Sequence, residues 1–141
     1  IIGICNGFQI LLESQLLEGA LINNNKVKFR SKVVSLNTEN YDTTFTQDIP
    51  KNKEIIMPIA HRQGNYIASE NMLKKLKDNN QIAFTYSDLK GGNPNGSCLD
   101  IAGIFNESKN VLGMMPHPER ASDPILGSDD GLYIFNSILM G

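Results

Sequence analysis

The chain has 141 residues, of which 20% are charged and 40% are hydrophobic, and its formal net charge at pH 7 is −2. This length suits one domain with a real hydrophobic core. The charge balance shows no basic excess that would indicate nucleic-acid binding, and no run of about 18 apolar residues predicts a membrane-spanning helix. Cys5 and Cys98 occur in a sequence with no visible export signal, so we expect free thiols rather than a disulfide. We therefore expect a single domain over residues 1–141, located in the cytoplasm, that binds neither nucleic acid nor a membrane.

The N-terminal segment predicts a buried strand, a sharp turn and a helix. Residues 1–4 read Ile-Ile-Gly-Ile, a run that suits the interior of a parallel sheet. Cys5 follows, between Gly3 and Gly7. A reactive side chain between small residues at a strand-to-helix turn is typical of a nucleophile elbow, and the turn is expected to need both glycines. The helix N-terminus is expected to favour the thiolate of Cys5, and the helix itself is expected to end near Gly19.

Further along the chain, strands and helices alternate. This alternation predicts an α/β fold with a mainly parallel sheet and helices on both faces, in which the chemistry lies at the carboxyl ends of the strands. A nucleophile strand normally has neighbours on both sides, so we expect the chain to be the C-terminal part of a longer protein, truncated at its N-terminus. The sequence predicts strands at 26–36, 43–45, 55–60, 81–86, 101–105 and 111–114, a loop at 87–97, and helices from Ser69 to about 79 and from about 129 to 139.

His117 and Glu119 form a His-x-Glu sequence directly after the predicted strand 111–114. Pro118 lies between them and restricts His117 to an extended backbone. A carboxylate within reach of an imidazole sets its tautomer and stabilises the imidazolium that forms when it takes a proton. Together with Cys5 these residues predict a catalytic triad in which a thiolate attacks a carbonyl carbon. The backbone N–H of Asn6 is expected to stabilise the oxyanion, with a second donor supplied by another loop.

Three interpretations stay open beside the triad. His61, at the end of the predicted strand 55–60, is a rival base, or a structural or substrate-binding histidine. Cys5, His61, His117 and Asp123 are possible metal ligands by residue type, but they lack the usual close ligand spacing, so we expect no metal site. The glycine-rich segment 91–96 lacks the Lys-Ser/Thr pair of a phosphate-binding loop, and is interpreted as a tight surface loop or a contact surface.

Several segments resemble the class I glutamine amidotransferases, whose fold is a flavodoxin-like α/β domain. The resemblance rests on Gly-Ile-Cys-Asn-Gly-Phe-Gln at 3–9 and Pro-His-Pro-Glu at 116–119. Within that class, 58–61, 93–97, 101–104 and 113–120 are similar to the glutaminase subunits of phosphoribosylformylglycinamidine synthase, an enzyme of purine biosynthesis. The resemblance implies that Cys5 attacks the side-chain amide of glutamine and releases ammonia, while His117 shuttles the proton and Glu119 orients His117.

The same resemblance implies a substrate, partners and cofactors. Asn6, Gln9 and His61 are the predicted glutamine-binding residues, and no cofactor is expected on this chain. ATP and magnesium would act on a large synthetase subunit that receives the ammonia, and a small accessory subunit would complete the enzyme. The chain has Arg62-Gln63 where the family tends to have Gly-Glu, and it lacks the family's earlier oxyanion loop. The alternatives are another class I amidotransferase or cysteine hydrolase of the same fold, or an inactive remnant that docks a synthetase.

Overall fold

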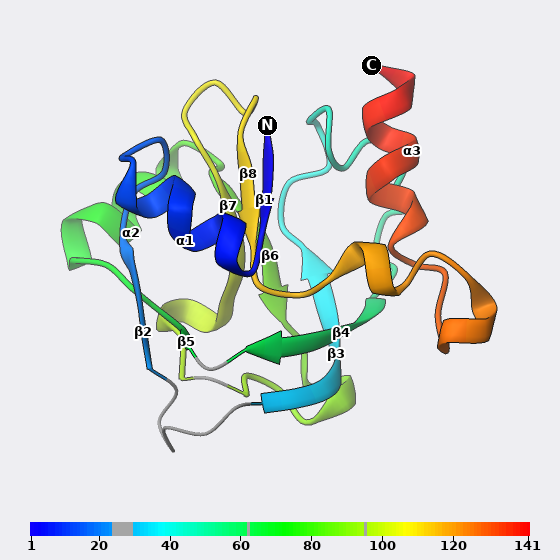
Figure 1. Cartoon of the computed structure of the whole chain (residues 1–141). Helices are drawn as coiled ribbons and strands as arrows, with labels where there is room; N and C mark the ends of the chain where they lie inside the picture. The colour runs from blue at the N-terminus through cyan, green and yellow to red at the C-terminus, as the bar shows by residue number, and fades with distance from the viewer. Residues whose placement is uncertain (24–29, 62, 95) are drawn as a thin grey trace.

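The structure is a computed structural model that describes residues 1–23, 30–61, 63–94 and 96–141. Six strands form one sheet in the order β1-β8-β7-β6-β3-β4, and β2 and β5 form a separate antiparallel pair (Figure 1). The strands are β1 (Ile2–Ile4), β2 (Ala20–Asn23), β3 (Arg30–Thr38), β4 (Ile55–His61), β5 (Gln63–Ile67), β6 (Ile82–Tyr86), β7 (Ile101–Phe105) and β8 (Leu112–Met114). The α-helices are α1 (Asn6–Glu13), α2 (Glu70–Asp78) and α3 (Leu132–Met140).

Helices cover both faces of the six-stranded sheet, as the sequence predicts (Figure 1). On one face, Phe8 of α1 and Leu76 of α2 belong to one buried cluster. On the other face, Ile134 of α3 belongs to a second cluster. Leu112 packs in the α3 cluster, whereas Met115 packs in the α1 cluster. Because the side chains of residues 112–115 point to both buried faces of the sheet, this segment around β8 is apolar throughout. None of the helices in the described part of the chain is long and apolar enough to span a bilayer.

Strand pairing differs from the predicted mainly parallel sheet. β1 and β8 are parallel, with Ile4 opposite Met114, but the other four pairings in this sheet are antiparallel. Parallel neighbours need a long crossover connection, whereas antiparallel neighbours need only a short turn. β7 and β8 are joined by such a turn, in which the side-chain oxygen of Asn106 accepts hydrogen bonds from the N–H groups of Asn110 and Val111. For β7 and β8, the short connection therefore requires antiparallel pairing.

The six-stranded sheet curls, so that β4 at one end of the strand order approaches the ends of β1 and β8. The N–H of His117 donates to the carbonyl of Pro58 at 2.9 Å. The Cys5 thiol donates to the carbonyl of Ala60 at 3.6 Å. The carboxyl ends of three strands therefore meet at one place, which is where the sequence places its candidate site.

The open edge of β4 is capped by the segment that leads into α3. The N–H of Ile56 donates to Asp130 Oδ2 at 2.8 Å, and the carbonyl of Ile56 accepts from Ser128 Oγ at 2.8 Å. Lys53 Nζ lies 3.9 Å from the other oxygen of Asp130. The side chains of Asp130 and Ser128 thus make the backbone hydrogen bonds that a neighbouring strand would otherwise make at this edge.

We expect Asp130→Ala to lower the free energy of unfolding by about 1–3 kcal/mol, because it leaves the partly buried N–H of Ile56 unpaired. Denaturant unfolding followed by circular dichroism measures the change. Asp129→Ala is the matched control, since Asp129 is the neighbouring exposed carboxylate. Equal stabilities for the two variants would contradict the capping role of Asp130.

The first helix is shorter than predicted. α1 ends at Glu13, because Gln15 has a φ of 64° and the N–H groups of Leu16 and Leu17 both bond to the carbonyl of Leu11. Leu17 is buried as a result, whereas Leu16 is exposed. The predicted helix end at Gly19 is therefore wrong, and that glycine leads into β2 instead.

The outcomes of the other local predictions are mixed. Ser69 is the N-cap of α2, as predicted, and its Oγ accepts from the N–H of Met72 at 3.2 Å. The predicted strand 43–45 is wrong: this segment forms a turn in which Thr43 and Thr46 hydroxyls lie 2.7 Å apart. The predicted loop 87–97 contains a short 3-10 helix at Asp88–Lys90. Part of the predicted strand 26–36, residues 26–29, lies outside the described residues.

Candidate active site

Cys5 occupies the turn between β1 and α1, with φ 56° and ψ −105°. A positive φ is unusual for a residue other than glycine and has an energetic cost that the surroundings must offset. The N–H of Cys5 donates to the carbonyl of Met114 at 2.8 Å, which fixes the turn to β8. Strand, sharp turn and helix therefore have the geometry of a nucleophile elbow.

The two glycines beside Cys5 have different roles. A Cβ on Gly3 would lie 2.6 Å from the carbonyl oxygen of Gly7, because the first turn of α1 rests directly on β1. A Cβ on Gly7 would have no atom of the described residues within 4 Å. The expectation that both glycines are required by the turn is thus correct for Gly3 and wrong for Gly7.

His117 follows β8 and precedes the 3-10 turn η3 (Pro118–Arg120). Its Nδ1 lies 2.9 Å and 3.2 Å from the two carboxylate oxygens of Glu119. The histidine is 8% exposed, and its Nε2 is buried without a hydrogen-bond partner among the described residues. A neutral ring that donates from Nδ1 to a carboxylate keeps its free lone pair on Nε2. Glu119 therefore orients the imidazole, but Nε2 is not in hydrogen-bond contact with the Cys5 thiol, which donates to the carbonyl of Ala60 instead.

The protonation of Cys5 depends on more than the helix N-terminus. Burial raises the pKa of the Cys5 thiol above its ordinary value, and this effect outweighs the Asn6 backbone N–H and the Arg120 charge, which lower it. The negative charge of Glu119 raises the pKa further. The thiol also donates to the carbonyl of Ala60, an interaction of the neutral form. The helix N-terminus favours the thiolate, as expected, but burial outweighs this effect, so a base is needed to activate the sulfur.

Because burial raises the pKa of the Cys5 thiol, we expect its alkylation by iodoacetamide to be slower than that of N-acetylcysteine at pH 7.5. The alkylation rate is expected to keep rising with pH beyond the midpoint of this free thiol. Quantifying the Cys5 peptide by mass spectrometry at several pH values measures the titration. A midpoint below that of N-acetylcysteine would show a stabilised thiolate and contradict this description.

The predicted substrate-binding residues lie around the same turn. Asn6 is the exposed first residue of α1, and its N–H interacts with the Cys5 sulfur. Gln9 lies one turn further on, and its amide donates to Glu13 at 3.1 Å. His61 ends β4, but its side chain lies outside the described residues, as does all of Arg62. The glutamine-binding roles of Asn6, Gln9 and His61 therefore stay predictions.

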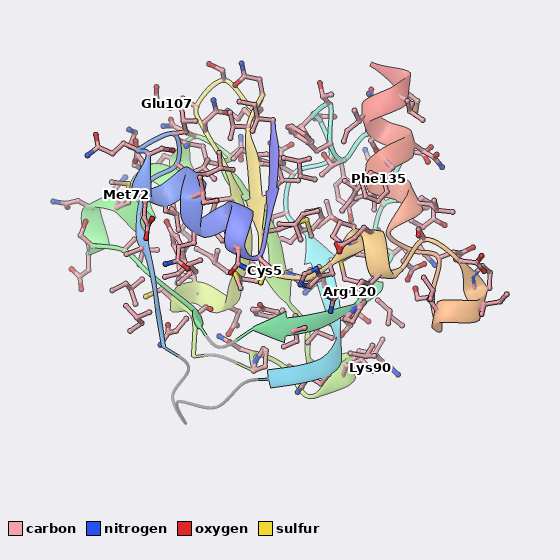
Figure 2. All side chains as sticks on the ribbon, viewed as in Figure 1. Cys5, Met72, Lys90, Glu107, Arg120 and Phe135 are labelled. Atoms are coloured by element: carbon pink, nitrogen blue, oxygen red, sulfur yellow. The ribbon has the colours of Figure 1, made fainter. Side chains whose placement is uncertain are left out.

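Two features of the site were not predicted from the sequence. The carbonyl of Ala60 accepts from the thiol, and a backbone group of this kind leaves no signal in residue type. Arg120 acts electrostatically on Cys5, and its place directly after the His-x-Glu sequence was an available signal. Figure 2 shows Cys5 where β1 turns into α1, with Arg120 on the segment that follows β8.

Metal ligation and a disulfide are the other roles that these side chains could have. No three His, Cys, Asp or Glu side chains within the described ranges form a group that could hold a metal ion. Asp123 instead caps a short turn, where it accepts from the N–H of Ile125 at 3.0 Å. Cys5 and Cys98 are both free, as predicted.

The fold and the site together have the arrangement expected for a nucleophilic cysteine in an α/β fold. A cysteine at a strand-to-helix turn, and an imidazole held by a carboxylate at the neighbouring strand end, are the features that define it. The chain belongs to the family of CobB/CobQ-like glutamine amidotransferase domains, whose model matches residues 1–129.

Solved structures agree with this assignment. The chain is 45% identical to a chain in the structure of PurLQS from Thermotoga maritima, with a TM-score of 0.86 over 99% of this chain and 60% of that one. A putative GMP synthase protein from Thermoplasma acidophilum is 15% identical, with a TM-score of 0.62 over 99% of this chain and 55% of that one. The glutaminase domain of Trypanosoma brucei CTPS with bound acivicin is 12% identical, with a TM-score of 0.57 over 99% and 60%.

These matches differ in what they establish. The last two structures show the fold alone, and together with the first they confirm the predicted class I glutamine amidotransferase fold. The chain spans 55–60% of the length of these three relatives.

Proposed function

We propose that this protein is the glutamine amidotransferase subunit of phosphoribosylformylglycinamidine synthase. It would hydrolyse glutamine to glutamate and ammonia for de novo purine biosynthesis. The observation that carries the proposal is the arrangement of Cys5, His117 and Glu119 in a chain of the amidotransferase family. The 45% identity to a chain of PurLQS supports the particular enzyme.

The position of Cys5 and His117 at the ends of the paired strands β1 and β8 supports a two-step acyl transfer, for which the thiol must turn from the Ala60 carbonyl to His117. His117 Nε2 takes the thiol proton, and the Cys5 sulfur attacks the side-chain carbonyl carbon of glutamine. The N–H of Asn6 stabilises the oxyanion of the tetrahedral intermediate, with a second donor expected from another segment. His117 then returns the proton to the leaving nitrogen, which departs as ammonia and leaves a glutamyl thioester on Cys5. Water deprotonated by His117 hydrolyses the thioester to glutamate and regenerates the thiol.

The other groups act around this step. Glu119 holds His117 in the tautomer that leaves Nε2 free and stabilises the imidazolium. Gln9 and His61 are proposed to bind glutamine together with Asn6. The ammonia would pass to a large synthetase subunit that carries ATP and magnesium, with a small accessory subunit in the same cytoplasmic complex. The match to a chain of PurLQS supports these partners.

Treatment with 6-diazo-5-oxo-norleucine, a reactive glutamine analogue, tests the proposal. Mass spectrometry should find the label on Cys5 and not on Cys98, and the protein mixed with its synthetase subunit should form glutamate from glutamine. Turnover of peptides or glyoxals without glutamine turnover would identify a different cysteine hydrolase. An unlabelled Cys5 with no glutamate formed would indicate a remnant that only docks the synthetase. Either of these outcomes overturns the proposal.

A further inference from the structure

Arg120 lies next to Glu119, the residue whose carboxylate orients the candidate base His117. It is the last residue of η3, and its N–H donates to the carbonyl of His117 at 3.1 Å. Its Nε lies 4.0 Å from Glu119 Oε2, the oxygen that is 2.9 Å from His117 Nδ1. The imidazole of His117, the carboxylate of Glu119 and the guanidinium of Arg120 therefore all belong to one short turn.

The backbone that carries Arg120 is held on both sides. The N–H of Ala121 donates to the carbonyl of Pro118 at 3.0 Å and closes the turn. The N–H of Gly131 donates to the carbonyl of Ala121 at 2.7 Å, and a Cβ on Gly131 would collide with the carbonyl of Pro118. The start of α3 is thus packed tightly against η3, which fixes the backbone from which the Arg120 side chain extends.

Few charged groups act on the Cys5 sulfur in the described part of the chain. The charges that act on it are those of Arg120 and Glu119, both from η3. The first turn of α1 contains no acidic residue, and β4 contributes the neutral carbonyl of Ala60. The side chain of His61 lies outside the described residues. Since a guanidinium carries its charge at all physiological pH values, Arg120 supplies the one positive charge among these groups that acts on the sulfur.

We propose that Arg120 is a positioning residue of this site: its guanidinium holds Glu119 toward His117 and supplies the positive charge that stabilises the Cys5 sulfur as it loses its proton. The proposal rests on the glutaminase function proposed above. Once the proton has moved, the charges alternate as thiolate, imidazolium, carboxylate and guanidinium. The proton transfer leaves the net charge of the group unchanged, so the effect of Arg120 is on the thiolate itself: its positive charge lowers the pKa of the Cys5 thiol, and without it the thiolate forms less readily.

The variants Arg120→Gln and Arg120→Lys distinguish the effect of the positive charge from the effect of the side chain's shape, because only the lysine keeps the charge. The readout is the rate of Cys5 alkylation by iodoacetamide between pH 6 and 10, quantified on the Cys5 peptide by mass spectrometry. We expect Arg120→Gln to move the titration midpoint upward and to slow alkylation at pH 7.5 by about two- to fivefold, the range for a half-exposed charge. Arg120→Lys, which keeps the charge, should retain most of the wild-type rate.

Lys90→Gln is the matched control. It also removes one positive charge, from the exposed turn Asp88–Lys90, and Lys90 is not among the groups that act on Cys5 (Figure 2). Its alkylation profile should equal that of the wild type. A wild-type profile for Arg120→Gln, or an equal shift in Lys90→Gln, would overturn the proposal, because Arg120 would then be an ordinary surface charge.

Glutamine hydrolysis in the complex with the synthetase subunit supplies the second readout. We expect Arg120→Gln to lower kcat and leave KM nearly unchanged. A raised KM with unchanged kcat would overturn the proposal, because Arg120 would then bind the substrate carboxylate. The experiments distinguish a failure of the proposed glutaminase function from a failure of the proposed role of Arg120. If the wild type does not hydrolyse glutamine but the alkylation midpoint still shifts, the glutaminase function is wrong and the action of Arg120 on Cys5 stands.

Discussion

Cys5→Ser is expected to lower glutamate formation by about 10⁴-fold or more, because removing the nucleophile of a cooperating catalytic group costs rates of this order. A serine hydroxyl at this position has nearly the size of the thiol but is far less acidic, so His117 cannot activate it as it does sulfur. The measurement is the steady-state rate of glutamate release from glutamine in the complex with the synthetase subunit.

Cys98→Ser is the matched control for this variant. Cys98 is the other free cysteine, and it begins the short 3-10 helix Cys98–Asp100, far from Cys5 in the sequence. We expect its glutaminase rate to equal that of the wild type. If Cys5→Ser retains wild-type activity, or if only Cys98→Ser loses it, Cys5 is not the nucleophile.

Gly3→Ala is expected to lower the free energy of unfolding by about 1–3 kcal/mol or more, the range for overpacking a well-packed site. The added Cβ would lie 2.6 Å from the backbone oxygen of Gly7 and 2.5 Å from Leu11 Cδ1. A side chain can relieve such a clash by changing its rotamer, but the backbone oxygen of Gly7 cannot, so α1 must move away from β1. Denaturant unfolding measures the loss of stability, and Cys5 alkylation measures the change at the elbow.

Gly7→Ala is the control for Gly3→Ala, because the same side chain is added at the glycine on the other side of Cys5. Its Cβ meets no atom of the described residues within 4 Å. Alanine is also a better helix former than glycine, so we expect stability to be unchanged or raised by about 0.5–1 kcal/mol. Equal destabilisation by both substitutions would contradict the different roles that the structure assigns to the two glycines.

Arg120 shows how a site residue is missed when its signal is read in isolation. A single arginine after Pro-Glu is ordinary in composition, and only the turn that places it beside Glu119 gives it a partner. The carbonyl of Ala60 is a stronger case, because every residue carries a carbonyl. Its contact with the thiol arises from the curl of the sheet, which depends on how β3, β4 and β6 pair.

The sequence by itself determined the features whose signals are local. Gly3-Ile4-Cys5 and His117-Pro118-Glu119 each carry their chemistry within a few residues, and the Ser69 cap is a local signal as well. The same segments carried the resemblance to the glutamine amidotransferases, the family to which the chain belongs.

Only the tertiary structure decided the features that depend on distant contacts. The pairing of β4 and β8 with their neighbours, the early end of α1 and the burial of Leu17 follow from packing between segments far apart in the chain. The raised pKa of the Cys5 thiol is the clearest example, because burial, which no local sequence pattern reveals, outweighs the helix N-terminus that favours ionisation. Local chemistry therefore selects the cysteine, and the packed fold decides whether that cysteine rests as a thiol or as a thiolate.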